Sequence, residues 1–214
     1  MGARELEVKV HPTAVITGDV EFLGRAEVGA HVYLEGPLLI EDGVKIYPGC
    51  VIGCRAESYG EGTSDAPIHI GAGTVLREKV VIQRSLSGGR PTSIGENCYI
   101  MDGCHVAHDC RVDGEVTMAP KVVLGGHSTI MFRANLGIGS MTHQFVTVGA
   151  YAMVGMGSVV IHDIRPGAKV CGSPAEIYGK NDFGLRKYGD PELGLYLAEF
   201  ERVRSRMGAR MRRQ

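Results

Sequence analysis

Large aliphatic residues recur at every sixth position along most of this 214-residue chain. One unbroken run begins at Val10 and ends at Ile52, and a second run in the same phase extends from Ile94 to Val160, with Thr142 as its exception. If about a third of residues qualified by chance, the first run would arise on the order of once in several thousand starts. The position four residues after each aliphatic is mostly small, and Gly, Asp, Pro and Asn crowd the remaining places.

A six-residue unit is too short for a helix–turn repeat, and its glycine-rich corners oppose long helices. The pattern fits a parallel β-helix, in which three short strands and three turns make an 18-residue coil and successive coils stack about 4.8 Å apart. Each buried aliphatic contributes roughly 1.5–3 kcal/mol before entropy is subtracted, so the interior column can hold such a rod together. We therefore predict an all-β fold, with a β-helix domain over residues 8–176.

Two segments interrupt the pattern without losing its phase. We expect residues 54–69 and 84–92 to be loops that leave the rod at its corners. Loops on a rigid scaffold commonly carry binding, although a solvated insertion explains them equally well.

The hexad pattern disappears after residue 176, and we expect residues 177–214 to form a short C-terminal helical segment. Asp190-Pro191-Glu192 is a typical helix start. Helical spacing follows in the apolar residues Leu193, Tyr196, Leu197, Phe200, Val203 and Met207. The basic stretch from Arg202 to Arg213 is either a solvated helix end or a landing site for an acidic protein or a phosphate-bearing ligand.

Composition excludes several other classes of protein. The formal net charge of −1 gives no reason to expect a nucleic-acid or membrane-surface partner. No stretch approaches the roughly 18 apolar residues that span a bilayer, and the N-terminus lacks a signal-peptide core, so we expect a cytoplasmic protein. Six cysteines without a Cys-x-x-Cys pair argue against a disulfide framework and a zinc finger.

Histidines gather on one predicted face. The 18-residue coil places His108, His127 and His143 on three consecutive coils, with His105 at the corner just before. Zinc is one interpretation of such a cluster. The His-x4-His pair of the trimeric β-helix carbonic anhydrases is absent, and we do not expect a metal.

Longer motifs then resemble a known family. Ala107-His108-Asp109, Leu124-Gly125-Gly126-His127, His143-Gln144-Phe145 and Gly172-Ser173-Pro174-Ala175 resemble the UDP-N-acetylglucosamine O-acyltransferases of lipid A biosynthesis. The resemblance implies a left-handed β-helix and a homotrimer with sites between neighbouring rods. It also implies transfer of a 3-hydroxyacyl chain from acyl carrier protein to a hydroxyl of a UDP-amino sugar. The acyl group would be carried on the phosphopantetheine of acyl carrier protein, so no separate cofactor is expected.

A sugar hydroxyl is a poor nucleophile near neutral pH. A base that removes its proton during attack typically raises the reaction rate by about 10²–10⁴-fold. The resemblance implies that His108 is this base, that Asp109 is its acidic partner and that the Gly126 N–H meets the oxyanion. The substrate-binding residues that it implies are His105, His127, His143, Gln144, Asn181, Arg186 and Lys187.

Met156 stands where the family places its hydrocarbon ruler, the side chain that closes the acyl groove. Methionine fills more of the groove than glycine, so a shorter donor chain is expected. The alternative is an adaptable core methionine.

Some positions depart from the family pattern. Glu57, Ser58 and Gly60 stand where the family tends to place a lysine and acidic contacts, and Gln83 replaces a histidine. The C-terminal region is also shorter. These departures leave open a paralogue that acts on another nucleotide sugar, an N-acyl- or N-acetyltransferase, or a non-catalytic rod.

Overall fold

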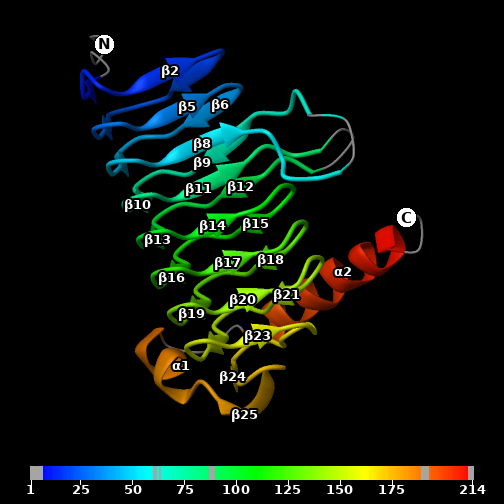
Figure 1. Cartoon of the computed structure of the whole chain (residues 1–214). Coiled ribbons are helices and arrows are strands. Elements are labelled where there is room, and N and C mark those ends of the chain that lie inside the picture. Colours follow the sequence, from blue (N-terminus) through cyan, green and yellow to red (C-terminus); the bar gives the residue numbers. More distant parts are fainter. Residues whose placement is uncertain (1–6, 60–61, 63, 87–89, 189–192, 212–214) are drawn as a thin grey trace.

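The computed structural model describes residues 7–59, 62, 64–86, 90–188 and 193–211, and all structural statements below refer to these. The chain winds into a three-sided rod (Figure 1), and each side is a sheet to which every coil adds one strand. Strands pair in parallel with the strand three places later, and in the regular coils the partners are 18 residues apart, as in Val106 with Leu124. The prediction of a parallel β-helix is confirmed.

The first sheet holds ten strands: β1 (Val8–Val10), β4 (Ala26–Val28), β7 (Val44–Ile46), β10 (Val75–Leu76), β13 (Tyr99–Ile100), β16 (Thr117–Met118), β19 (Asn135–Leu136), β22 (Met153–Val154), β24 (Ala168–Cys171) and β25 (Glu176–Lys180). The second sheet holds eight: β2 (Val15–Thr17), β5 (Tyr33–Glu35), β8 (Val51–Cys54), β11 (Val81–Gln83), β14 (His105–Val106), β17 (Val123–Leu124), β20 (Met141–Thr142) and β23 (Val159–Val160). The third sheet holds seven: β3 (Val20–Phe22), β6 (Leu38–Ile40), β9 (Ile68–Ile70), β12 (Ser93–Ile94), β15 (Arg111–Val112), β18 (Thr129–Ile130) and β21 (Thr147–Val148).

The coil is left-handed. In Figure 1 the chain crosses the near face from left to right while successive coils step down from the N-terminus. The residues of the six-residue period point inward and form one continuous core, in which Leu34, Ile82 and Leu124 are fully buried. The small inward positions hold Cys98, Cys104 and other small residues, so each layer of the core pairs a large side chain with a small one.

The exception in the repeat, Thr142, has a specific role. Its side chain is buried, and its Oγ1 accepts a hydrogen bond from the Gly125 N–H at 3.2 Å and contacts Ser128 Oγ at 3.0 Å. A hydroxyl at this core position therefore ties down the turn that follows β17.

Both expected loops leave the rod from the corner between the second and third sheets, which we call the site corner. The connection from β8 to β9 covers residues 55–67, because Cys54 ends β8 and Ile68 begins β9. The connection from β11 to β12 covers residues 84–92, as predicted. In Figure 1 the described parts of both connections, cyan and green, project to the right of the coils.

The C-terminal segment differs in part from expectation. Residues 176–180 form β25, which pairs antiparallel with β24 and covers the last edge of the first sheet, where unpaired backbone groups would otherwise face solvent. Two helices follow, α1 (Asp182–Tyr188) and α2 (Leu193–Met211). The expected helix start at Asp190-Pro191-Glu192 lies outside the described residues.

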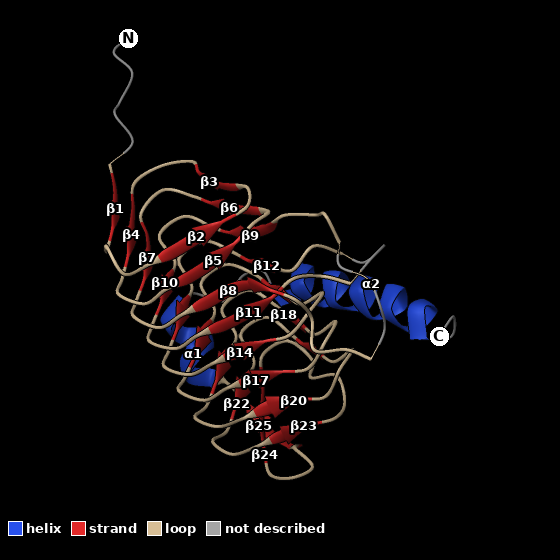
Figure 2. Cartoon of the chain, turned by 45° about the horizontal axis from the view of Figure 1, so that its top comes forward, coloured by secondary structure: helices blue, strands red, loops and turns tan. Residues whose placement is uncertain are grey.

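Helix α2 packs against the rod beside the third sheet (Figure 2). Phe200 is buried against Met131 and Ala150, and Tyr196 stacks on Phe132 with ring centroids 5.8 Å apart. Of the apolar residues with helical spacing, these two face the rod, Leu197 is exposed, and the side chains of Leu193 and Met207 lie outside the part of the chain that the structure describes. None of the described helices is both long enough and apolar enough to cross a membrane.

Candidate active site

The site corner repeats the same turn in every regular coil. We count the places of each turn from its inward residue of the six-residue period, such as Val106 or Leu124. The fourth place in three consecutive coils holds Asp109, His127 and Phe145, and their φ angles are +59°, +61° and +65°. The turn therefore needs a left-handed residue at this place, a conformation that few non-glycine residues adopt. Because the turn is the same in each coil, it presents the three side chains in one column.

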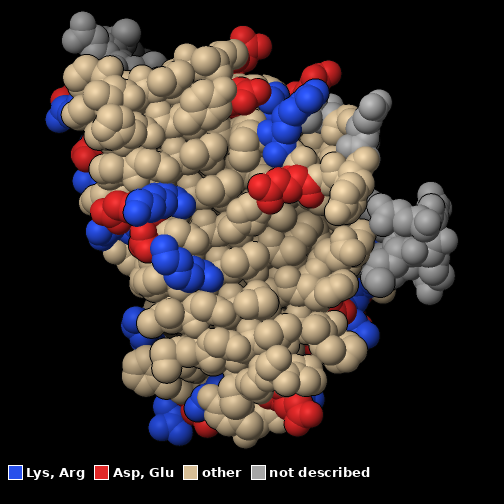
Figure 3. Space-filling model, in the orientation of Figure 1, with Lys and Arg blue, Asp and Glu red and all other residues tan. Residues whose placement is uncertain are grey.

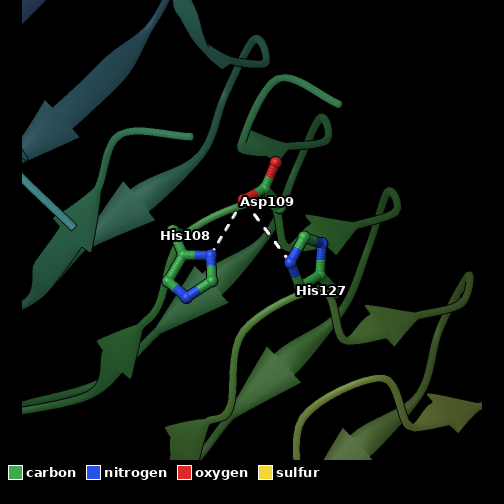
Figure 4. A group of neighbouring side chains, drawn as sticks. All are labelled: His108, Asp109 and His127. Carbon is green, nitrogen blue, oxygen red and sulfur yellow. Dashed lines mark hydrogen bonds and ion pairs between the residues drawn. The ribbon is translucent and has the colours of Figure 1, made fainter. Parts of the chain in front are cut away.

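His108 and Asp109 form a hydrogen-bonded pair (Figure 4). His108 Nδ1 lies 2.8 Å from Asp109 Oδ2, and the Asp109 carboxylate is fully buried. The same oxygen accepts a hydrogen bond from the Leu86 N–H at 3.2 Å and lies 3.8 Å from His127 Nε2. When Nδ1 donates to the carboxylate, the Nε2 of His108 is left as the acceptor, which is the tautomer that a general base needs.

Gly126 lies directly against this imidazole. A Cβ on Gly126 would stand 2.6 Å from Cε1 and 2.7 Å from Nε2 of His108. Only glycine therefore lets the His108 ring lie so close to the next coil. The Gly125 N–H donates to the Thr142 carbonyl at 3.1 Å, whereas among the described residues the Gly126 N–H has no acceptor. The expected role of that N–H at the oxyanion stays a prediction.

Rings continue the column along the rod. His127 meets His108 edge-on with centroids 5.1 Å apart, and it stacks on Phe145 at 4.4 Å and 5°. The sequence analysis placed His108, His127 and His143 on one face but missed Phe145 as the next member of this column. Phe145 could have been found, because it stands 18 residues after His127.

His143 and Gln144 belong to the same turn as Phe145 but are exposed, and His143 Nδ1 lies 3.2 Å from the Gln144 carbonyl oxygen. His105 points outward from β14 on the adjoining face. Burial lowers the pKa of the His105 imidazole, and the Glu57 carboxylate opposes that shift. Glu57 belongs to the first loop, so this loop borders the histidines from the side of the second sheet.

The sequence and fold of this chain resemble those of known proteins. Residues 91–126 match the bacterial transferase hexapeptide (six repeats) model. The acyl-[acyl-carrier-protein]–UDP-N-acetylglucosamine O-acyltransferase of Agrobacterium fabrum is 31% identical over 200 residues, which cover 85% of this chain and 74% of the relative. The chain belongs to the UDP-N-acetylglucosamine O-acyltransferase family.

Other members of the family are also similar to this chain. The enzyme of the same name from Sinorhizobium fredii is 36% identical over 164 residues, or 76% of this chain and 61% of the relative. A solved structure of the Francisella novicida UDP-N-acetylglucosamine acyltransferase superposes with a TM-score of 0.72 at 25% identity, covering 87% of this chain and 71% of that chain. The chain spans about 60% of the length of the curated relatives from Sinorhizobium fredii and Rhizobium etli.

The remaining residues that the family resemblance suggested do not lie beside His108 in the single chain. Met156 is 74% exposed at a different corner, between the first and second sheets. Asn181 caps α1, because its Oδ1 accepts from the Gly184 N–H at 3.2 Å while its Nδ2 donates to the Tyr151 carbonyl at 2.9 Å. Arg186 and Lys187 are exposed on α1 at the C-terminal end of the rod (Figure 1). Their substrate contacts stay predictions.

A metal ion fits this family member's site poorly. His108, Asp109 and His127 offer three ligand atoms within 4.8 Å of one another. Ligands about 2.0–2.1 Å from a tetrahedral zinc ion are separated by roughly 3.3 Å. The two separations that involve Asp109 Oδ2 are 2.8 Å and 3.8 Å, and the shorter one is a hydrogen-bond distance. The geometry favours a base held by a carboxylate.

Proposed function

We propose that this protein transfers a 3-hydroxyacyl chain from acyl carrier protein to a hydroxyl of UDP-N-acetylglucosamine, the first step of lipid A biosynthesis. The 2.8 Å bond between His108 Nδ1 and the buried Asp109 carboxylate is the observation that carries the proposal. The relatives described above are acyl-[acyl-carrier-protein]–UDP-N-acetylglucosamine O-acyltransferases, and the proposed acyl donor and acceptor follow from these activities.

His108 Nε2 takes the proton of the sugar hydroxyl as its oxygen attacks the thioester carbonyl carbon. The Asp109 carboxylate stabilises the imidazolium that forms. The Gly126 N–H donates to the oxyanion of the tetrahedral intermediate. Collapse of that intermediate breaks the carbon–sulfur bond, and the imidazolium returns the proton to the departing thiolate. The acyl group arrives on the phosphopantetheine arm of the carrier, and the reaction needs no further cofactor.

The active assembly is a homotrimer with one site between each pair of rods. In support, the outer face of the second sheet carries few charges over β17 and β20 (Figure 3). Val123 and Met141 on this face are 40% and 42% exposed, and Ile138 and Met156 adjoin it. Apolar surface of this kind is typical of an interface. Light scattering of the purified protein should give three times the chain mass of 22.9 kDa.

We place the reaction in the cytoplasm, where acyl carrier protein and nucleotide sugars are found. Fractionation of the source cells, with a membrane marker and a secreted marker as references, tests this location.

The His108→Ala variant tests the chemistry. We expect its transfer rate to fall by about 10²–10⁴-fold while the trimer persists. His31→Ala, which removes an exposed histidine from a turn at another corner, is the matched control and should leave the rate unchanged. Mass spectrometry of products, with hydroxyacyl carrier proteins and UDP-sugars as substrates, identifies the acceptor atom. An amide product, or equal activity in His108→Ala and wild type, would contradict the proposal.

A further inference from the structure

The turns of the site corner normally hold one another through backbone bonds. In the two turns that follow the Asp109 turn, the N–H at the fourth place donates to the carbonyl at the third place of the preceding coil. His127 donates to the His108 carbonyl at 3.0 Å, and Phe145 donates to the Gly126 carbonyl at 2.9 Å. His127 and Phe145 are therefore each fixed by the coil before them.

Asp109 cannot use this bond. In the preceding coil, counted from Ile82, the third place is Arg84. The second loop begins at this residue, so the chain leaves the rod where the carbonyl acceptor would stand. The Asp109 N–H instead donates to Thr92 Oγ1 at 2.9 Å. The Thr92 hydroxyl thus replaces the carbonyl that the loop removed.

The second loop holds Asp109 at two further atoms. The Leu86 N–H donates to Oδ2 of the carboxylate at 3.2 Å, and Nη2 of Arg90 donates to the Asp109 carbonyl at 3.2 Å. The same Arg90 nitrogen lies 3.2 Å from Thr129 Oγ1 on the third sheet. The backbone N–H, the backbone carbonyl and the carboxylate of Asp109 each receive one contact from this loop.

The base of the loop is closed by its own bonds. Ser85 Oγ donates to the Arg90 carbonyl at 2.8 Å and accepts from the Thr92 N–H at 2.8 Å. The Ser85 and Thr92 side chains are both buried. Because a buried polar group left without a partner is costly, these bonds hold the two ends of the loop in one arrangement.

We propose that Ser85, Leu86, Arg90 and Thr92 form a positioning clamp that fixes the Asp109 carboxylate and, through it, the ring of His108. These are positioning residues, because their contacts reach the base only through Asp109. The catalytic consequence of the clamp rests on the proposed function, whereas its effect on the His108–Asp109 bond does not.

Thr92→Val removes the acceptor oxygen and keeps a similar shape, and Thr92→Ser keeps the oxygen. We expect kcat of Thr92→Val to fall at least roughly tenfold with KM within about twofold of wild type, since small displacements of a catalytic group have large effects. Thr92→Ser should stay within about threefold of wild type. Arg90→Met, which leaves Thr92 in place, should also lower kcat.

Thr74→Val is the matched control. Thr74 is equally buried, accepts from the Cys98 N–H at 3.0 Å and donates to the Gly95 carbonyl at 2.7 Å, but it lies at another corner. This variant removes a similar buried bond and should keep the wild-type kcat. If it loses as much rate as Thr92→Val, the effect is general destabilisation and the clamp is rejected.

Proton NMR of the full chain gives a readout that does not depend on activity. The Nδ1 proton that His108 donates to Asp109 should give a low-field resonance in wild type, Thr92→Ser and Thr74→Val, and this resonance should move or vanish in Thr92→Val. An unchanged resonance and unchanged kcat in Thr92→Val would overturn the inference. A wild type without transferase activity would instead refute the proposed function, and the resonance would still decide the clamp.

Discussion

At the scale of single residues, the site depends on close approach between neighbouring coils. Gly126 has no side chain, and the His108 ring occupies the space that a Cβ would need. The carboxylate that holds this ring is fully buried. The base is therefore confined on one side by backbone and on the other by an acid, which limits the orientations open to it.

Gly126→Ala should lower kcat by about 10²-fold, because its Cβ would lie 2.6 Å from His108 Cε1 and must displace the ring. Gly114→Ala is the control, since Gly114 also occupies the third place of its turn and its added Cβ would come no closer than 3.3 Å to another atom, the nearest being in the flexible Glu96 side chain. Steady-state kinetics and thermal unfolding of both variants make the comparison. Equal rates in the two variants would mean that the contact with His108 has no catalytic role.

Met156 is predicted to limit the length of the acyl chain in the assembled protein. We expect the wild type to prefer ten-carbon over fourteen-carbon hydroxyacyl donors, and Met156→Ala to reverse this preference by roughly tenfold in kcat/KM. Met153→Ala, on the neighbouring strand, should change little. Competition between the two acyl carrier proteins measures the ratio, and a wild type that favours fourteen carbons would disprove the assignment.

At the scale of elements, α2 is attached to the rod by a small contact. Phe200 is 3% exposed against Met131 and Ala150, and Arg204 pairs with Asp163 at 3.1 Å. An exposed ion pair of this kind contributes about 0–1 kcal/mol, so the aromatic contact is the stronger attachment.

Phe200→Ala should weaken the docking of α2 by about 3 kcal/mol. This loss corresponds to a rise of roughly 10²-fold in the amide exchange of α2, while exchange in the strands should stay unchanged. Hydrogen exchange with mass spectrometry follows both regions. Leu197→Ala removes an exposed side chain from the same helix and should leave exchange as in wild type. If the two variants behave alike, α2 is held by something other than Phe200.

Elements also show where sequence reasoning reached its limit. The period of six determines which residues pair, so the stacking of Val106 on Leu124 could be predicted from the repeat alone. The loops have no period, and nothing in residues 84–92 indicates that Thr92 would reach Asp109. The strand β25 was also missed, because its residues are all exposed and lack the alternation of a half-buried strand.

At the scale of the whole molecule, site contacts that follow from the repeat could be predicted from the sequence, and contacts made by segments outside the repeat could not. His108 and Asp109 are adjacent in the chain, and His127 follows one coil later, so their meeting was predictable from spacing alone. Asn181 caps α1, which the sequence did not predict, and its contact with substrate stays a prediction. A cap depends on where a helix begins, and helix boundaries are less clear in a sequence than the register of a repeat.

The continuous core also predicts the reactivity of the cysteines. Burial raises the pKa of Cys50, Cys98 and Cys104 to about 11 and that of Cys110 to about 12. The thiolate is the reactive form, so at pH 8 these four thiols should resist alkylation, and raising the pH toward 10 should change little while the fold persists.

Exposed Cys171 should react promptly, and half-buried Cys54, whose pKa burial also raises, should react more slowly. Titration with a thiol reagent, before and after unfolding in guanidinium, counts the groups. Reaction of more than these two thiols in the native protein would mean that the rod opens far more readily than its packing implies.

The column of Asp109, His127 and Phe145 has a consequence for how such an enzyme can change. Its members stand one coil apart, and the 4.4 Å between the ring centroids of His127 and Phe145 is close to the spacing of stacked strands. Natural selection can exchange the side chain at any of these places, but it cannot alter the interval between them without rebuilding the ladder. New substrate specificity in this lineage must therefore come from a change of residue type at positions of fixed spacing, or from the loops that border these positions.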